Sequence, residues 1–255
     1  MNVLAAIAIA ACAAAASPAT AAQPSANGLP VGARYDPDPD PARRRTDLEN
    51  MRRLRFTVVA LGTFGGGDTR DVVPIDRLLA GDTKAAFTMR AAELGVVPVG
   101  PRTAPEGVRE SAWTLIASGA RGVLFDDWKG LQQNERALAE AGAFAEGLTR
   151  NSALYEPLRK VPAAGDRAFT IDGAQGSIEA HWLESDDALV LIAVNHAAQA
   201  QEVTIMFAPA IPEAIWQNML SGSAVNFVAG PSGPFYQRRF APHEVVVLMI
   251  RKRLK

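Results

Sequence analysis

The stretch that decides the fold is "TAPEGVRESAWTLIASGARGVLFDDWKG", residues 103–130. Thr103 and Glu106 have the spacing of a helix capping box, and apolar residues recur at helical spacing behind them. Gly119 is placed to end this helix, and the apolar run 122–125 follows as a buried strand. A helix leading directly into a continuous apolar strand is typical of a parallel sheet with crossover helices.

The same alternation extends over residues 33–150. Asp40 and Pro41 predict the start of a helix at 41–54, whose arginine cluster is expected on the solvated face. The other expected elements are strands at 57–61, 85–91 and 96–99, a short helix at 75–79, a loop at 62–71 and a helix at 131–149. After about residue 160, short strands between turn residues recur, which predicts an antiparallel β-sandwich.

Residues 1–22 are expected to be a secretory signal. The run is apolar but too short to span a bilayer, and Ala19-Thr20-Ala21 supplies a small-x-small cleavage site. An alternative is a lipoprotein, because Ile9-Ala10-Ala11-Cys12 resembles a lipobox and would make Cys12 a lipid anchor. Either interpretation predicts a secreted or periplasmic bacterial protein. The predicted division is a signal peptide at 1–22, a flexible leader at 23–32, an α/β domain at 33–158 and a β-sandwich at 159–255.

The composition argues against several functional classes. The net charge of −1 gives no electrostatic case for a nucleic-acid partner. Cys12 is the only cysteine, and the three histidines, His181, His196 and His243, lie far apart in the sequence, so no metal site is expected. The glycines at 62–67 lack the spacing of a phosphate-binding loop, which argues against a nucleotide cofactor.

Carboxylates at the expected strand ends are the best candidates for chemistry. Neighbouring residues of a strand point to opposite faces, so Asp126 should face a pocket while Asp127 caps the next helix. Trp128 follows at once, and an exposed indole beside a carboxylate suits the face of a sugar. A tryptophan buried between helix and sheet is the alternative. Asp36 and Glu93 hold similar places at other expected strand ends.

Three segments resemble parts of clan A glycoside hydrolases, most closely the family 42 β-galactosidase type. "GARYDPDPDPARRRTDLENMRRLRFTVVALGTF", residues 32–64, resembles the first β-α-β unit of the barrel. "APEGVRESAWTLIASGARGVLFDDWKGL", residues 104–131, resembles its last helix and strand, and residues 188–207 and 241–250 resemble the small β-sandwich that closes many such enzymes. The resemblance implies an α/β fold, a partial TIM-type (β/α) barrel followed by an antiparallel β-sandwich, with carbohydrate as the partner.

The chain also departs from that family. A complete barrel needs about 250 residues, and residues 33–150 supply about half. The family's Asn-Glu pair after the fourth strand has no counterpart, because Asn134-Glu135 falls in the expected last helix. Aligning "FTMRAAELG", residues 87–95, with the seventh strand places Arg90 or Ala91 where the nucleophile belongs, with Glu93 nearby.

Two hypotheses follow. In the first, the protein is an exported glycosidase in which Asp126 and Glu93 are catalytic, and Asp127, Trp128, Tyr35 and Asp36 bind the substrate. In the second, it is a non-catalytic carbohydrate-binding or vestigial relative, because the family's glutamates are missing. Four parallel strands cannot close into a barrel, so we expect the β-sandwich or a second copy in a homodimer to cover the open edge.

Overall fold

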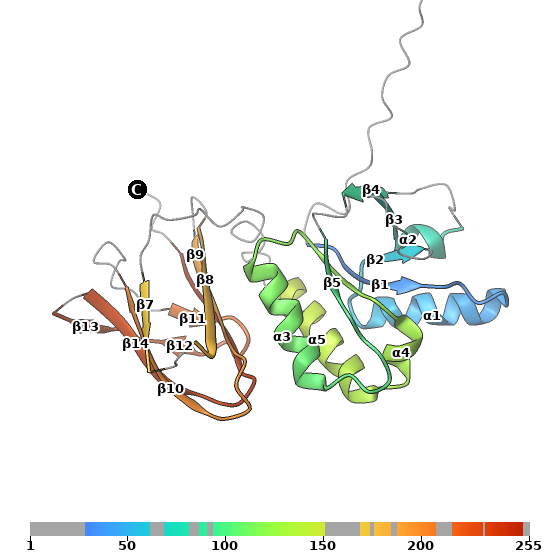
Figure 1. The fold of residues 1–255 in the computed structure, drawn as a ribbon. Helices are drawn as coiled ribbons and strands as arrows, with labels where there is room; N and C mark the ends of the chain where they lie inside the picture. The colour runs from blue at the N-terminus through green and yellow to red at the C-terminus, as the bar shows by residue number, and fades with distance from the viewer. Residues whose placement is uncertain are drawn as a thin grey trace, which may run out of the picture.

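The computed structural model describes residues 29–61, 69–81, 87–90, 94–150, 169–173, 176–184, 188–207, 216–231 and 233–251. They form an α/β part, which ends at residue 150, and an all-β part, which begins at residue 169 (Figure 1). The predicted change from alternating helices and strands to strands alone is therefore confirmed.

The α/β part is built on a six-stranded sheet with the order β4-β3-β2-β1-β6-β5. Neighbouring strands among β5, β6, β1 and β2 pair in parallel, whereas β3 pairs antiparallel with both β2 and β4. The strands are β1 (Val31–Tyr35), β2 (Val58–Leu61), β3 (Thr69–Pro74), β4 (Phe87–Arg90), β5 (Gly95–Val97) and β6 (Val123–Phe125). The last parallel strand along the chain, β6, thus lies beside the first, β1.

The helices of this part follow the sequence patterns closely. They are α1 (Pro41–Arg53), α2 (Ile75–Leu79), α3 (Pro105–Ala117), α4 (Trp128–Gln132) and α5 (Glu135–Arg150). The predicted cap of α1 is confirmed, because Asp40 Oδ1 accepts a 2.9 Å hydrogen bond from the N–H of Ala42. The cluster Arg43, Arg44, Arg45, Arg52 and Arg53 is exposed, as its expected place on the solvated face requires. Among the described residues, no helix is long and apolar enough to cross a membrane.

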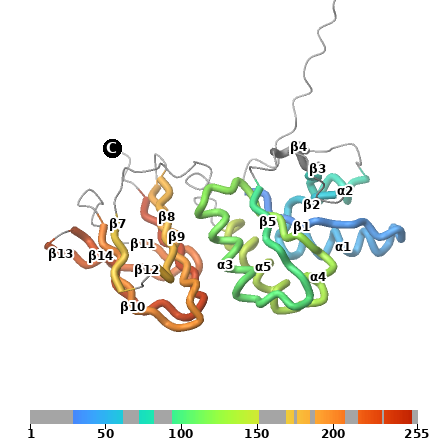
Figure 2. The backbone as a smooth tube through the Cα atoms, viewed as in Figure 1, coloured from blue at the N-terminus to red at the C-terminus, as the bar shows by residue number. Residues whose placement is uncertain are grey.

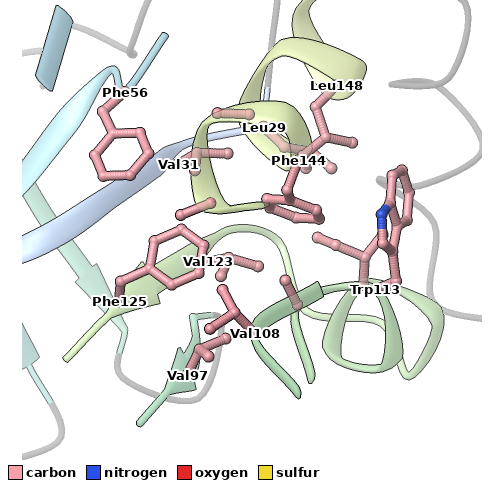
Figure 3. Close-up of a cluster of buried hydrophobic side chains, with 14 of the residues drawn as sticks. Leu29, Val31, Phe56, Val97, Val108, Trp113, Val123, Phe125, Phe144 and Leu148 are labelled. Carbon is pink, nitrogen blue, oxygen red and sulfur yellow. The ribbon is translucent and has the colours of Figure 1, made fainter. Parts of the chain in front are cut away.

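The helices cover one face of the sheet. Residues Val31, Val97, Val123 and Phe125 of the strands pack with α1, α3 and α5 in one buried cluster, part of which Figure 3 shows around Phe125 and Phe144. The alternate strand residues Val58, Ala60, Val72 and Leu124 join Leu94 in a separate buried cluster that contains no helical residue. Because side chains alternate between the two faces of a strand, successive residues pack into two different buried clusters.

The all-β part is a sandwich of two antiparallel sheets. One has the order β13-β14-β10-β7 and the other β12-β11-β15-β9-β8, and a buried cluster with residues from both lies between them. The strands are β7 (Phe169–Asp172), β8 (Ile178–Glu184), β9 (Ala188–Asn195), β10 (Gln201–Phe207), β11 (Trp216–Asn218), β12 (Ala224–Val225), β13 (Val228–Gly230), β14 (Gly233–Phe240) and β15 (Val245–Arg251). The sequence patterns missed β11.

Helix α3 packs against the sandwich, on the sheet that contains β8, β9 and β15 (Figures 1 and 2). This contact explains why all eight residues of β9 are buried. Leu189 and Leu191 point into the sandwich core, whereas Val190 and Ile192 belong to the same cluster as the helices of the α/β part. Both faces of β9 are therefore covered, and its sequence is apolar throughout rather than alternating.

Several predictions about local structure were wrong. The N-cap of α3 is Ala104, because Thr103 Oγ1 turns back and accepts a hydrogen bond from Gly100 N–H at 2.8 Å. The helix expected at 131–149 is two helices, and Asn134 caps the second by accepting from the N–H of Ala137 at 3.1 Å. β1 begins at Val31, inside the predicted leader, and β3 begins inside the predicted loop at 62–71.

The prediction that the sandwich covers an open sheet edge was also wrong. The outer edge of β2 pairs with β3, and the sandwich packs on α3 instead. Among the described strands, β4 and β5 lie at the two ends of the sheet, and β6 lies between β1 and β5. The alignment of residues 87–95 with a seventh barrel strand is therefore wrong, because β4 lies at the end of the sheet opposite to β5 and β6.

Candidate functional site

The parallel strands β1, β2, β5 and β6 end at the same edge of the sheet, which we call the C-terminal edge. In sheets of this kind, the segments that follow the strands form the ligand site. Asp36 follows β1 and is exposed, and Asp126 follows β6. The predicted catalytic residue Glu93 lies outside the described residues.

Asp126 faces the side of the sheet that the helices leave uncovered. Phe125 belongs to the helix-side cluster and Leu124 to the opposite one, so alternation places Asp126 with Leu124. The side chain of Arg34, on β1, is directed to the same place, with Nη1 3.5 Å from Asp126 Oδ1. The two side chains are 27% and 34% exposed, respectively. This part of the C-terminal edge therefore offers a guanidinium–carboxylate pair.

Asp127 is turned away from Asp126. It is the N-cap of α4, as predicted, and its carbonyl oxygen accepts a hydrogen bond from the N–H of Leu131 at 3.0 Å, although its side chain makes no capping bond. Asp127 Oδ2 lies so close to Gly130 that a Cβ at position 130 would come within 2.5 Å of it. The two aspartates therefore face different places, as strand alternation predicts.

Trp128 is part of the core, so the prediction that its indole is exposed for a sugar was wrong. The side chain is 1% exposed, and its ring packs edge-on against Phe56, with the ring centroids 6.1 Å apart. Phe56 in turn stacks on Phe125. The alternative, a tryptophan buried between helix and sheet, is confirmed. The first turn of α4 packs against the helix-side core.

Tyr35 is also buried, but its hydroxyl takes part in a polar network. The side chain is 1% exposed, and its hydroxyl donates to Asp47 Oδ2 at 3.3 Å. Gln132 Nε2 donates to the other oxygen, Asp47 Oδ1, at 2.9 Å. Burial, and then the negative charge of Asp47, raises the pKa of Tyr35 to about 12. Tyr35 therefore stays a hydrogen-bond donor at neutral pH and fixes Asp47 instead of offering its own ring to a ligand.

Asp47 and Gln132 lie in a groove of about 500 Å³ between α1 and α4. We call it the polar groove, and it is lined by Asp38, Ala42, Arg43, Thr46, Asp47, Lys129, Gln132 and Gln133. Nearly all of these side chains donate or accept hydrogen bonds. A second hollow, of about 350 Å³ between α1 and α2, is lined mainly by proline and leucine side chains with Arg44 and Arg45. The chemistry of the polar groove suits a ligand rich in hydroxyl groups better than that of this second hollow.

A second polar cluster lies where α3 meets the sandwich. It brings together His181, His196 and His243, which lie far apart in the sequence, with Glu110 of α3 and Glu179 of β8. His196 and Glu110 are 86 positions apart, so no local pattern could have joined them. Among the residues that the structure describes, no group of three or more histidine, cysteine or acidic residues is placed to hold a metal ion.

No family model matches the chain, and no curated protein sequence matches it significantly. Solved structures of similar shape include an α-amylase from Anoxybacillus, with 14% identity and a TM-score of 0.41 over 77% of this chain and 39% of that one. Another is the Geobacillus thermoleovorans α-amylase complexed with acarbose (13% identity, TM-score 0.42, 72% of this chain and 38% of that one). A third is a family 27 β-L-arabinopyranosidase from Geobacillus stearothermophilus in complex with arabinose (8% identity, TM-score 0.38, 68% and 34%). The chain covers less than half of each enzyme, and at these identities and TM-scores the likeness assigns no residue a role.

Proposed function

We propose that this protein is an exported, non-catalytic relative of the clan A glycoside hydrolases that binds carbohydrate in the polar groove. The observation that carries the proposal is the groove itself, at the C-terminal edge, with Asp47 held by Tyr35 and Gln132. A carboxylate fixed by two donors is ready to accept hydrogen bonds from sugar hydroxyls, because its orientation costs little further entropy on binding.

The order of the parallel strands supports a partial barrel. The crossovers β1–α1–β2 and β5–α3–β6 step in the same direction along the sheet, and their helices lie on the same face. Crossovers that always step the same way are those of a singly wound barrel, in which the last strand pairs with the first. Here β6 pairs with β1, and β3, which is antiparallel to both neighbours, and β4 continue the sheet beyond β2.

The lack of catalysis is proposed from the residues at the C-terminal edge. Glycoside hydrolysis generally needs two carboxyl groups facing each other across the bond. Asp126 is paired with Arg34, and Asp127 is turned toward Gly130. With β5 as the strand beside β6, the family's nucleophile position falls after β5, where the chain reads Pro98-Val99-Gly100-Pro101 and has no carboxylate.

The test is a screen of the purified protein against an oligosaccharide array, followed by calorimetric titration of the best ligand and an assay with aryl glycosides. We expect binding without turnover. Asp47→Asn should weaken binding about tenfold, because asparagine has one acceptor where Asp47 uses two oxygens, so Tyr35 or Gln132 loses its partner.

The matched control is Glu49→Gln, which removes one carboxylate from the same helix but lies outside the polar groove and pairs with Arg45. It should bind as the unchanged protein does. Equal binding by both variants would reject the groove. Turnover that Asp126→Asn abolishes would instead show an active glycosidase and reject the non-catalytic part of the proposal.

Export rests on residues 1–22, which lie outside the described residues. We expect expression of the full sequence in a bacterium to yield protein in the periplasm or medium, shortened at its N-terminus by cleavage after Ala21 or Ala22. Mass spectrometry of the recovered chain separates this outcome from lipidation at Cys12, which would leave an acylated N-terminus in the membrane fraction. Uncleaved protein in the cytoplasm would contradict both.

A further inference from the structure

All three histidines of the protein take part in one connected series of side-chain contacts between α3 and the sandwich. Glu110 Oε1 lies 2.5 Å from His243 Nδ1, and Glu110 Oε2 lies 3.1 Å from His196 Nδ1. Glu179 Oε2 lies 3.0 Å from His196 Nε2, and its other oxygen lies 2.6 Å from His181 Nε2. Glu110 belongs to the α/β part and the other four residues belong to the sandwich, so this chain of contacts crosses the junction.

His196 occupies the centre, and its surroundings favour one protonation state. Both ring nitrogens face a carboxylate oxygen at hydrogen-bond distance. A neutral imidazole carries one N–H, so one of its two nitrogens would direct a lone pair at a carboxylate. A protonated imidazole donates from both nitrogens. The two contacts are therefore both favourable only when His196 carries its proton.

In the described part of the chain, two ion pairs lie beside the cluster. Arg109 of α3 approaches Glu140 of α5 at 3.4 Å and donates to the carbonyl oxygen of His243 at 3.1 Å. Next to His243, Glu244 pairs with Arg238 at 2.7 Å. The side chain of Glu110 is only 12% exposed, so its charge lies in a place where solvent screens it weakly.

We propose that Glu110, His196 and Glu179 form a pH-sensitive latch that fastens α3 to the β-sandwich at mildly acidic pH and loosens it above neutral pH. Histidine is the side chain that ordinarily changes charge in this range, near a pH of about 6.5. The contribution of His196 is present while the imidazole is protonated and is lost as the pH rises and the proton leaves. The apolar contacts of α3 with β8, β9 and β15 hold the parts together at either pH.

At low pH, protonation of Glu179 weakens the latch. Burial acts to raise the pKa of Glu179, but the hydrogen bonds and positive charge of His181 and His196 outweigh it and lower the pKa below the ordinary value. A lowered carboxyl pKa contributes stability above the ordinary carboxyl range and loses it as the pH falls through the lowered value. Glu179 therefore keeps its charge, and its part of the latch, until the pH falls below the ordinary carboxyl range.

The test compares thermal unfolding of the full chain and of His196→Gln at about pH 5.5 and about pH 8, on either side of histidine titration. His196→Gln should lower the Tm by about 4 °C at the acidic pH and by about 1 °C or less at the alkaline pH. Glu110→Gln should give the same pattern. Glu146→Gln, which removes an exposed carboxylate paired with Arg150, should change the Tm little at both.

A destabilisation by His196→Gln that is equal at the two pH values would overturn the latch and leave a purely structural contact. NMR of the imidazole nitrogens provides an independent readout, since only three histidines need assignment. The Nδ1 signal of His196 should shift in Glu110→Gln, because this nitrogen loses its carboxylate partner. Identical His196 spectra in the two proteins would also reject the proposal.

Discussion

Trp128→Ala should lower the free energy of unfolding by about 3–5 kcal/mol, the usual cost of deleting a buried large aromatic side chain. Trp128 is 1% exposed and lies among Phe56 and the other residues of the helix-side core. Its removal leaves a cavity at the point where α4 is anchored to the sheet. Urea unfolding followed by circular dichroism measures the loss directly.

Lys129→Ala is the control for this prediction. Lys129 is the next residue along α4, is exposed and lines the polar groove, so its removal should change stability by no more than about 0.5 kcal/mol. A Trp128→Ala protein that unfolds like the unchanged chain but no longer binds carbohydrate would restore the view of Trp128 as a sugar platform. The comparison therefore separates a core tryptophan from a ligand-binding one.

Gly32→Ala should destabilise the protein by about 3 kcal/mol or more. The added methyl group would collide with backbone atoms, which cannot move aside as a flexible side chain can. Gly32 is the partner of Val58 in the parallel pairing of β1 with β2. A Cβ at position 32 would overlap the backbone oxygen of Val58. The two strands would have to separate, which would break the pairing at the centre of the sheet. The unfolding midpoint in urea is the measurement.

Gly107→Ala provides a matched change of glycine to alanine. Gly107 lies in α3, and nothing stands within 4 Å of a Cβ built there. Alanine is favoured over glycine in a helix by up to about 1 kcal/mol, so this variant should be as stable as the unchanged protein or more so. If Gly32→Ala behaved like Gly107→Ala, the register of β1 against β2 would be wrong.

Local patterns predicted much of the fold. Asp40 with Pro41 set the start of α1, and the short helix α2 has the predicted bounds. Gly119, with a φ of 98°, lies just beyond α3 and adopts the left-handed conformation that glycine favours. Strand alternation predicted that Asp126 and Asp127 point to different places. Each of these features depends on residues within about one helical turn or one strand. The local sequence is therefore sufficient to predict it.

The candidate site was predicted less well. The exposure of Trp128 depends on Phe56, which reaches it only after the sheet has formed. Asp47 becomes part of a groove because Gln132, 85 positions away, is brought against it by the pairing of β1 with β6. The hydroxyl of Tyr35 bonds Asp47 in that groove, whereas its ring belongs to the core.

The sequence by itself determined most of the helices and strands, the change from an α/β part to a β-sandwich, and the opposite orientations of Asp126 and Asp127. Only the tertiary structure decided that β3 pairs antiparallel with β2 and β4, that Trp128 is buried, and that three distant histidines share Glu110 and Glu179. The physical reason is the range of the interactions. Capping, helical periodicity and strand alternation act between near neighbours, whereas burial and ion pairing depend on which distant segments the fold brings together.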